Sequence, residues 1–549
     1  LHRLIRRQRQ MCIRDRKIMM YKTMKIKKIL VAMALFSPFS FAEAQQVWTP
    51  DNGDGTFTNP LMWGDWPDPD VIRVGDEFYM VSTSMHYVPG SPVAKSKDLV
   101  NWEMVGYAVD RYDEDPRYDM QGGTLYLNGS WANSIRYHNG RFYVAFCTPY
   151  GWGTEKGNFC ICEADKPEGP WKRTVFPEYL YDPGLLFDDN GKVYVVHGQH
   201  KLFVTELNAD VKSVKGKSVE IWNKGVDDAH HSGKNAGMEG SHVYKINGMY
   251  YILCPAGGTE GWQVCLRSKN IYGPYEHKVI IQDDSSYPTN GLHQGGMVQL
   301  KNGEWWFIIM QDRGAIGRVP CLLPVEWVDG WPMLGVNGKD AIVYPKPNVG
   351  KTYKIQSPAT TDEFNDRKLG LQWQWNHNPD NTCWSLTERP GYMRLKASLA
   401  KKLENARNTL TQRVQGPLST GTVEMDVSRM KDGNIAGFGI FQAPYAYVGI
   451  RQTKGARQLI VCNNGKETSI INQLKNDKVW FRARVTDKDF TARLYYSLDG
   501  KKFLPVGEIL HMDLGYPWTA NRFALLNYSE TQKGVGGIAD FNWFRFYNK

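Results

Sequence analysis

The sequence lacks a hydrophobic run long enough to span a bilayer, which would require about 20 apolar residues. The apolar run near the N-terminus covers only residues 29–36. Three lysines between residues 25 and 28 precede this run, and the small residues at 42–44 (Ala-Glu-Ala) suit a cleavage site. This order is typical of a secretory signal peptide. We therefore predict a signal peptide at 24–44 and a secreted or periplasmic protein that begins at Gln45 and does not insert into a membrane.

The chain also lacks net charge once this leader is set aside. Residues 1–23 are basic and show no periodicity, so we interpret them as translated upstream sequence and not as part of the fold. Residues 1–44 carry 11 Lys/Arg and two Asp/Glu, which leaves 56 basic and 55 acidic residues in 45–549. The formal pI of about 8.9 therefore does not indicate a nucleic-acid partner. A neutral surface suits an uncharged partner such as a polysaccharide.

Cysteines are few, and none of them has the spacing of a zinc site. Eight cysteines follow the leader, and most lie in apolar, strand-like runs. Cys160 and Cys162 would share one face of a strand. We expect buried thiols, and a disulfide remains an alternative in an oxidising compartment.

Helical periodicity is nearly absent, whereas short strands rich in Tyr, Val and Phe recur with Asn-Gly or Gly-Asp turns. Five segments repeat one pattern, an apolar strand, a glycine turn and an aromatic strand, which predicts a β-hairpin. Their starts lie about 50 to 60 residues apart, the period of four-stranded units in a β-propeller. We therefore predict a five-bladed β-propeller over residues 45–345. The five segments begin at Asp68, Trp131, Asp182, Glu239 and His293.

The five starting residues each precede an equivalent first-strand position by five residues. Because the innermost strand of every blade lines the propeller axis, residues in equal register point to one central place. Three of these residues are carboxylates: Asp68, Asp182 and Glu239. Such a group can bind a cation, or it can perform general acid–base catalysis. Glycoside hydrolysis needs one protonated carboxyl and one ionised carboxylate, and a third acid nearby raises the pKa of the proton donor.

Four motifs resemble glycoside hydrolase family 43. They are W-P-D-P-D at 66–70, Y-D-P-G-L-L-F-D-D-N-G-K-V-Y at 181–194, M-E-G-S-H-V-Y-K-I-N-G at 238–248, and a Gly-Arg pair at 317–318 that precedes P-V-E-W-V-D-G-W-P. Three acid motifs in the right order make the resemblance specific, and it extends over nearly the whole chain from residue 45. It implies an all-β fold and an inverting mechanism.

The resemblance also implies a role for each acid. Asp68 corresponds to the general base, Asp182 to the residue that tunes the pKa of the acid and orients it, and Glu239 to the general acid. Asp65 and Asp70 lie next to Asp68 and could be confused with it; only the blade register selects Asp68. Asp182 could alternatively form a turn before a proline.

Four further residues are candidates for substrate binding. By the same resemblance, His293 corresponds to an axial histidine that can hold a calcium ion or its waters, and a hydrogen-bonded structural histidine is the alternative. Arg318 corresponds to an arginine that contacts sugar hydroxyls, or it could cap a loop. Trp131 could stack on a sugar or pack in the core. His86 lies where the family has a loop at the rim of the site. No cofactor is expected to be required; one structural Ca²⁺ near the axis is possible by this analogy.

The pattern changes after residue 345. Residues 346–361 are rich in Pro, Lys and Thr and are predicted to be a linker, and 362–549 contain short alternating strands that predict an antiparallel β-sandwich. This unit resembles the concanavalin A-like jelly roll that follows the propeller in β-xylosidases and α-L-arabinofuranosidases of the family. Trp373, Trp375 and Trp384 leave a sugar-binding module open. By the resemblance, the sandwich instead packs on the propeller and walls one side of its pocket, which favours exo-action.

The sequence therefore predicts an inverting exo-acting hydrolase that releases terminal α-L-arabinofuranose, β-D-xylose or both from plant hemicellulose or its oligosaccharides. Two alternatives come from other classes. A retaining fructan hydrolase would carry a different motif set, which is not found here. A non-catalytic polysaccharide-binding propeller would not need three acids in register.

Overall fold

The computed structural model describes residues 47–151, 155–227, 235–285, 287, 290–515 and 518–548. The predicted upstream segment and signal peptide lie outside these residues. Within the described ranges, no helix is both long and apolar enough to cross a membrane.

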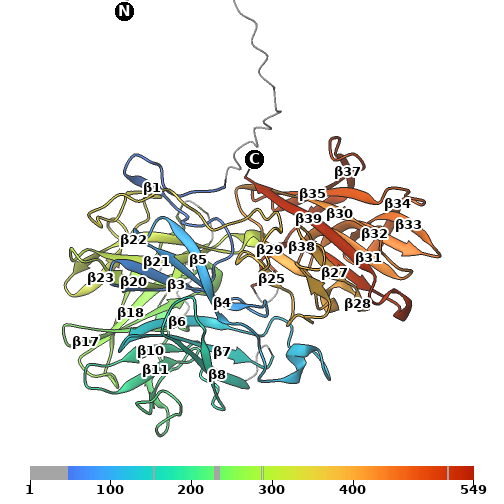
Figure 1. Cartoon of the computed structure of the whole chain (residues 1–549). Helices are drawn as coiled ribbons and strands as arrows, with labels where there is room; N and C mark the ends of the chain where they lie inside the picture. Colours follow the sequence, from blue (N-terminus) through green and yellow to red (C-terminus); the bar gives the residue numbers. More distant parts are fainter. Residues whose placement is uncertain are drawn as a thin grey trace, which may run out of the picture. The chain divides into compact units, whose positions relative to one another are not determined.

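The N-terminal part of the described chain forms five four-stranded antiparallel sheets, each built from one continuous segment (Figure 1). The strands are, in blade one, β2 (Asp70–Val74), β3 (Glu77–Val81), β4 (Gly90–Ser96) and β5 (Trp102–Val109); in blade two, β6 (Trp131–His138), β7 (Arg141–Pro149), β8 (Gly157–Ala164) and β9 (Lys172–Phe176); in blade three, β10 (Gly184–Phe187), β11 (Val193–His197), β12 (Leu202–Leu207) and β13 (Val219–Trp222); in blade four, β16 (His242–Ile246), β17 (Met249–Ala256), β18 (Trp262–Ser268) and β19 (Glu276–Ile281); and in blade five, β20 (Leu292–Gln299), β21 (Trp305–Asp312), β22 (Arg318–Val328) and β23 (Trp331–Leu334). The predicted five-bladed propeller is confirmed.

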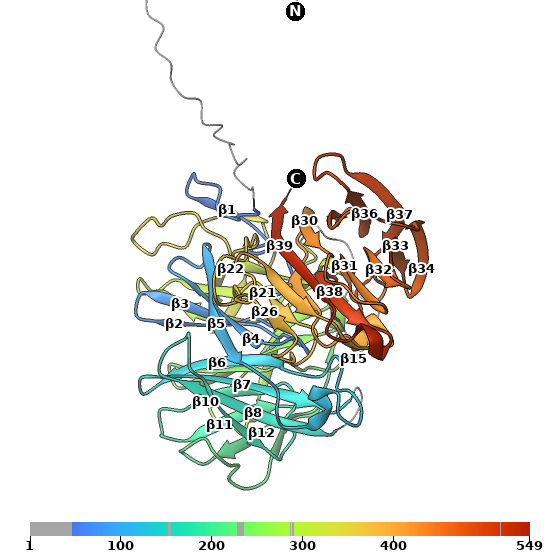
Figure 2. The ribbon, with the colours of Figure 1, turned by 45° about the vertical axis from the view of Figure 1, so that its right-hand side comes forward.

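The blades form a closed ring. The inner strand of blade two, β6, lies against the inner strands β2 and β10 of the blades on either side, and β2 also contacts β20 of blade five. Blades two and three accordingly lie side by side in both views (Figures 1 and 2). A short pair, β1 (Thr56–Thr58) with β24 (Val343–Pro345), joins the two ends of the propeller segment. Closure of the ring leaves the first residues of all inner strands near one axis.

Each blade carries one residue in the left-handed backbone conformation just before or within its inner strand. These residues are Asp68 (φ 51°), Ala132 (46°), Asp182 (51°), Gly240 (56°) and Gln294 (52°). The predicted equal register is therefore wrong by one residue in three blades, where Trp131, Glu239 and His293 precede the equivalent position. In blades two and five the pairing shifts next to Trp131 and His293, as at a β-bulge, because the strand holds an extra residue there.

A two-sheet β-sandwich follows the propeller, which confirms the predicted all-β fold with a second β-sandwich domain. One sheet contains β25 (Gln374–Trp375), β28 (Ser398–Leu399), β29 (Leu410–Arg413), β31 (Asn434–Phe441), β32 (Ala446–Thr453), β33 (Ala456–Asn463), β34 (Lys466–Ile471) and β38 (Arg522–Ser529). The other contains β26 (Trp384–Ser385), β27 (Met393–Lys396), β30 (Leu418–Asp426), β35 (Lys478–Thr486), β36 (Thr491–Ser497), β37 (Leu504–His511) and β39 (Ile538–Tyr547).

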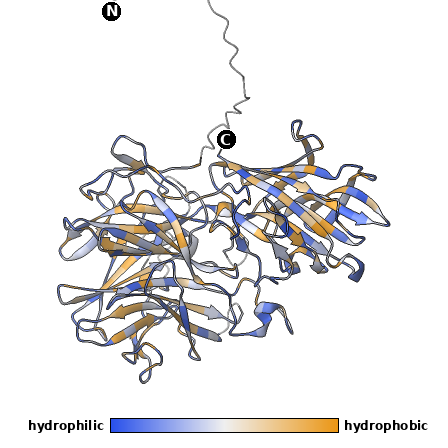
Figure 3. Cartoon of the chain, in the orientation of Figure 1, coloured by the Kyte–Doolittle hydropathy of each residue, from blue (hydrophilic) through white to orange (hydrophobic). Residues whose placement is uncertain are grey.

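Hydrophobic and hydrophilic residues alternate along strands of the sandwich (Figure 3), which allows one face of a sheet to be buried. In β35, Val479, Phe481, Ala483 and Val485 are fully buried while their neighbours are not. This period of two is expected for strands with one face in the core. The remaining regular elements are the strand pair β14 (Val226–Asp227) and β15 (Asn235–Ala236), and five short 3₁₀ helices, η1 (Pro116–Asp119), η2 (Gly258–Glu260), η3 (Gly314–Ile316), η4 (Leu403–Asn405) and η5 (Gln532–Gly534).

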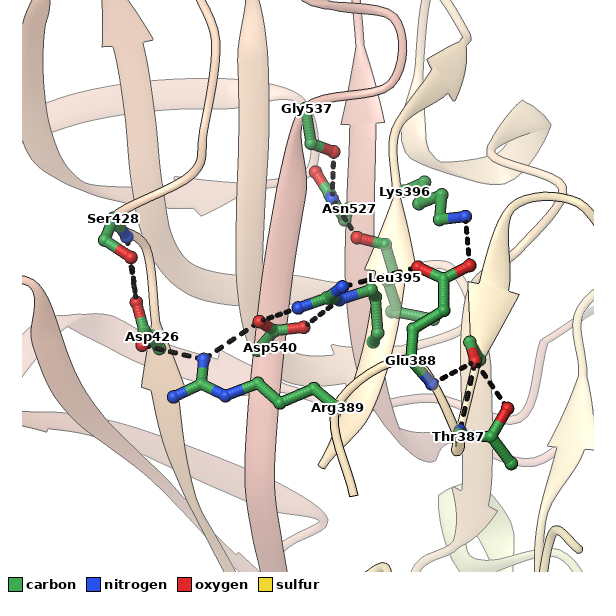
Figure 4. A network of polar contacts seen from close by, with 12 residues as sticks. Thr387, Glu388, Arg389, Leu395, Lys396, Asp426, Ser428, Asn527, Gly537 and Asp540 are labelled. Carbon is green, nitrogen blue, oxygen red and sulfur yellow. Dashed lines mark hydrogen bonds and ion pairs between the residues drawn. The ribbon is translucent and has the colours of Figure 1, made fainter. Parts of the chain in front are cut away.

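A buried carboxylate connects three neighbouring strands of one sandwich sheet. Asp540 on β39 accepts two hydrogen bonds from Arg394, at 2.7 and 2.9 Å, and a third at 2.9 Å from Arg389, which also bonds Asp426 (Figure 4). Paired guanidinium and carboxylate groups satisfy one another where water is excluded. This cluster lies within the sandwich and holds β27, β30 and β39 in register.

The cysteines of the described part are free thiols. Seven of the eight are buried, and Cys383 is half-buried. Cys160 and Cys162 lie on the same strand, β8, where both are buried against the core shared by the propeller and the sandwich. The buried thiols expected from the sequence are therefore packing residues.

Candidate active site

One pocket gathers six of the seven predicted site residues. Its lining includes the carboxylates of Asp68, Asp182 and Glu239, and also Trp131, His293 and Arg318. All five blades contribute, because each of these residues lies at the start of an inner strand or, for Arg318, at the start of β22. The fold thus brings three acids from distant parts of the sequence to one hollow.

Asp68 is paired with a buried arginine. Its Oδ1 accepts a hydrogen bond from Nη1 of Arg318 at 2.8 Å, and both side chains are almost fully buried. Neither Asp65 nor Asp70 lines the pocket. Asp65 instead accepts the backbone N–H of Arg318 at 3.0 Å. The acid that lines the hollow is therefore Asp68, which is paired with the guanidinium of Arg318.

Asp70 does not line the pocket and belongs to a separate cluster of charged residues. Its Oδ2 lies 2.6 Å from Nη1 of Arg136 and 3.4 Å from Nδ1 of His242, which come from blades two and four. Burial alone would raise the pKa of Asp70, but Arg136 and His242 hold it well below its ordinary value. This acid stays charged and links three blades, which is a structural role.

Asp182 is the second acid of the pocket. Its Oδ2 accepts the backbone N–H of Gly240 at 3.0 Å, so it holds the main chain next to Glu239. Burial, together with the negative charges of Glu239 and Asp68, raises the pKa of Asp182 well above its ordinary value. A glycine suits position 240, because φ is +56° there and an added Cβ would lie 2.6 Å from the side-chain amide of Gln294.

Glu239 has the environment of a proton donor. Burial raises the pKa of its carboxyl above the ordinary value; a hydrogen bond from Gln199 opposes this rise, and the charge of Asp68 adds to it. Its Oε2 lies 2.6 Å from Nε2 of Gln199 and 3.4 Å from the hydroxyl of Tyr181. A carboxyl that keeps its proton at higher pH, opposite an ionised carboxylate, is the pair that glycosidic bond cleavage requires.

The comparisons with known proteins place the chain. A model of glycosyl hydrolases family 43 matches residues 57–332, and a model of the beta xylosidase C-terminal concanavalin A-like domain matches 361–547. The chain belongs to glycoside hydrolase family 43. It is 36% identical over 500 residues to a putative beta-xylosidase of Xylanibacter ruminicola, covering 88% of this chain and 89% of that protein. It is 36% identical over 360 residues to a non-reducing end alpha-L-arabinofuranosidase of Bacteroides ovatus, covering 62% of this chain and 65% of that protein.

Solved structures agree with this assignment. A bifunctional GH43-CE protein of Bacteroides eggerthii superimposes with a TM-score of 0.80 at 38% identity, over 90% of this chain. The chain spans 64% of the length of that protein. An engineered GH43 hydrolase described as having endo-xylanase and exo-arabinofuranosidase activity superimposes with a TM-score of 0.79 at 29% identity, over 90% of this chain and 100% of that one. This family-43 protein is therefore a glycosidase that acts on carbohydrate.

Both ring nitrogens of His293 in this family-43 pocket have polar neighbours. Its Nδ1 lies 2.9 Å from the carbonyl oxygen of Gly291, and its Nε2 lies 3.4 Å from Oδ2 of Asp312. Among the described residues, no group of three or more His, Cys, Asp or Glu side chains is arranged to hold a metal. These contacts are those expected of a hydrogen-bonded histidine, and the Ca²⁺ suggested by the resemblance stays a prediction.

The structure places His86 away from the pocket lining. The ring is buried and its Nε2 lies 2.9 Å from Oδ1 of Asn376 in the sandwich. It packs beside Tyr126 and His377. The preceding residue, Met85, lines the pocket instead. The expectation that His86 contacts the sugar is corrected: the backbone turns at Met85 (φ 52°) and directs His86 into the contact with the sandwich.

Four residues of the site were not predicted from the sequence. Tyr181 and Gln199 contact Glu239, and Asp312 and Trp518 line the pocket. Tyr181 could have been found, because it directly precedes Asp182 in the third-blade motif. Trp518 could not, because it belongs to a loop of the sandwich and reaches the pocket only through domain packing.

Proposed function

We propose that this protein is an inverting, exo-acting hydrolase that releases terminal α-L-arabinofuranose, β-D-xylose or both from plant hemicellulose or its oligosaccharides. The observation that carries the proposal is the meeting of Asp68, Asp182 and Glu239 in one pocket. The relatives named beta-xylosidase and alpha-L-arabinofuranosidase support the choice of sugars. A secreted or periplasmic location remains a prediction from the leader.

In the proposed mechanism, Asp68 is the base. Its carboxylate, oriented by the hydrogen bond from Arg318, accepts a proton from a water that attacks the anomeric carbon. Glu239, whose pKa is raised, donates its proton to the departing glycosidic oxygen. Asp182 holds the backbone beside Glu239 by accepting the N–H of Gly240. One displacement of this kind inverts the anomeric centre, and it calls for the two acting carboxyls to be about 6.5–9.5 Å apart.

Residues of both domains line the pocket, and this supports exo-action. Trp518 of the sandwich and Trp131 of blade two both line it. Aromatic faces suit the apolar faces of a sugar ring. A pocket walled by a second domain admits the end of a chain more readily than its middle.

The test uses nitrophenyl α-L-arabinofuranoside and β-D-xyloside, followed by arabinoxylan, xyloglucan and arabinan. We expect the enzyme to release single sugars with inversion of the anomeric centre. NMR identifies the anomer that forms first. Glu239→Gln should lower kcat on unactivated oligosaccharides by about 10²–10⁴-fold, whereas the control Glu326→Gln, an exposed glutamate of β22, should leave it unchanged. A retained anomer would favour the retaining class, and sugar binding without any turnover by the wild type would favour the non-catalytic propeller.

A further inference from the structure

A fourth carboxylate lines the pocket and has no part in the proposed proton transfers. Asp312 ends β21 and is almost fully buried, with 2% of its surface exposed. Its Oδ2 lies 3.4 Å from Nε2 of His293. Its Oδ1 has no hydrogen-bond partner among the residues that the structure describes. A buried carboxylate oxygen without a partner is unfavourable, so its presence in a pocket calls for a ligand that satisfies it.

A matching donor lies on the neighbouring strand. Asp312 pairs directly with Arg318 in the β21–β22 ladder. The Nη1 of Arg318 binds Asp68, but its Nε is also buried without a partner in the described part of the chain. An acceptor and a donor therefore stand unsatisfied on adjacent strands at the wall of one pocket. A sugar hydroxyl can donate and accept at the same time, so it is a group that complements both.

Neighbouring residues hold the main chain and the side chain of Asp312 in place. Asn290 donates from Nδ2 to the backbone carbonyl of Asp312 at 2.8 Å. His293 lies against the other carboxyl oxygen and is itself fixed by the carbonyl of Gly291. The unpaired, buried oxygen is thus held in a fixed position in a residue that lines the pocket, as a specific binding contact requires.

We propose that Asp312 is a substrate-binding residue that accepts a hydrogen bond from one hydroxyl of the terminal sugar. This inference rests on the proposed glycosidase function and names the recognition of the released sugar by that site. A site built to bind a hydroxyl rejects an analogue that lacks it, because its buried polar atoms are then left unpaired. Asp312 therefore selects the sugar by one ring hydroxyl, while the three acids perform the cleavage.

The experiment compares the wild type, Asp312→Ala and Asp312→Asn on nitrophenyl β-D-xyloside and α-L-arabinofuranoside and on their monodeoxy analogues. For the preferred sugar, we expect one deoxy analogue to lose roughly 10- to 100-fold in kcat/KM with the wild type. The kcat/KM of Asp312→Ala on the parent substrate should be lower than that of the wild type by a similar factor. The kcat/KM of this variant on that deoxy analogue should be little lower than on the parent substrate. Asp312→Asn keeps the size and shape of the side chain and removes its charge. It replaces the alanine variant in this comparison if that variant does not fold.

The matched control is Asn290→Ala, which loosens the backbone of Asp312 without removing its carboxyl. Its effect should be the same on the parent and on every deoxy analogue. The proposal is overturned if no deoxy analogue loses more than a few-fold with the wild type, or if the Asp312 variants lose equally on all substrates. Failure of the wild type to hydrolyse either parent glycoside would instead refute the proposed function, so the two failures are distinguishable.

Discussion

The buried pair of Asp68 and Arg318 offers a sharp test of the site, because the two charges hold each other in a water-poor pocket. At 2.8 Å and an effective dielectric constant of about 20, their attraction is about 6 kcal/mol. Removing one partner of a buried pair costs about 3–5 kcal/mol, since the other charge is left uncompensated. We therefore expect Arg318→Met to lower the free energy of unfolding by about 3–5 kcal/mol.

Removing the second charge should restore most of this loss. In the double variant Asp68→Asn with Arg318→Met, neither member of the pair is left as an unpaired charge, so the two effects should not add. Urea titrations of the wild type, both single variants and the double variant form a complete double-mutant cycle. The double variant should be stable and still inactive, because it lacks the base. Stability and catalysis would then be separated in a single protein.

The control is an ion pair of similar distance at the surface. Arg267 lies 3.1 Å from Glu276, whose side chain is 71% exposed, so Glu276→Gln should cost no more than about 1 kcal/mol. Strictly additive losses for Asp68 and Arg318, or an equal cost for Glu276→Gln, would show that the pair is not energetically coupled. Either result would refute the assignment of Arg318 as the stabilising partner of the base.

Three further predictions follow from the same contacts. Asp182→Asn should lower kcat and raise the free energy of unfolding at pH 7. The native pKa of Asp182 is raised, so in the wild type ionisation opposes folding as the pH rises from the unfolded pKa towards the native pKa. In urea titrations the stability gain of the variant should therefore be smaller at pH 4 than at pH 7. Gly240→Ala should destabilise the fold by about 1–3 kcal/mol and lower kcat, because of the positive φ and the close amide of Gln294; thermal unfolding and kinetics check it. Trp518→Ala should raise KM for short oligosaccharides more than it changes kcat, as measured by initial rates.

The sequence was a good guide wherever a repeat carried the information. Five hairpins at a regular period were enough to predict the blades, since a four-stranded sheet needs about that length. The same repeat brought Asp68 and Asp182 to equivalent positions, which the backbone confirms, with φ of 51° in both. Glu239 was found as well, although it stands one residue earlier in its blade than the alignment assumed.

The register error has a physical origin that a pattern of hydrophobic residues does not reveal. A β-bulge adds one residue without changing the polarity of its neighbours, so Trp131 and His293 look equivalent to Asp68 in the sequence. In blade four, Gly240 takes the left-handed position and its N–H binds Asp182. The offset therefore places Glu239 beside, and not at, the position of the two aspartates.

This offset bears on the division of labour between the acids. Asp68 and Asp182 share one backbone conformation, but their neighbours differ: Arg318 supplies a cation to Asp68, whereas Gly240 supplies only a neutral N–H to Asp182. Burial and the nearby charges then raise the pKa of Asp182 and of Glu239. A nearly symmetric ring thus places one aspartate in an ion pair with an arginine from blade five, while burial and neighbouring charges raise the pKa of the other two acids.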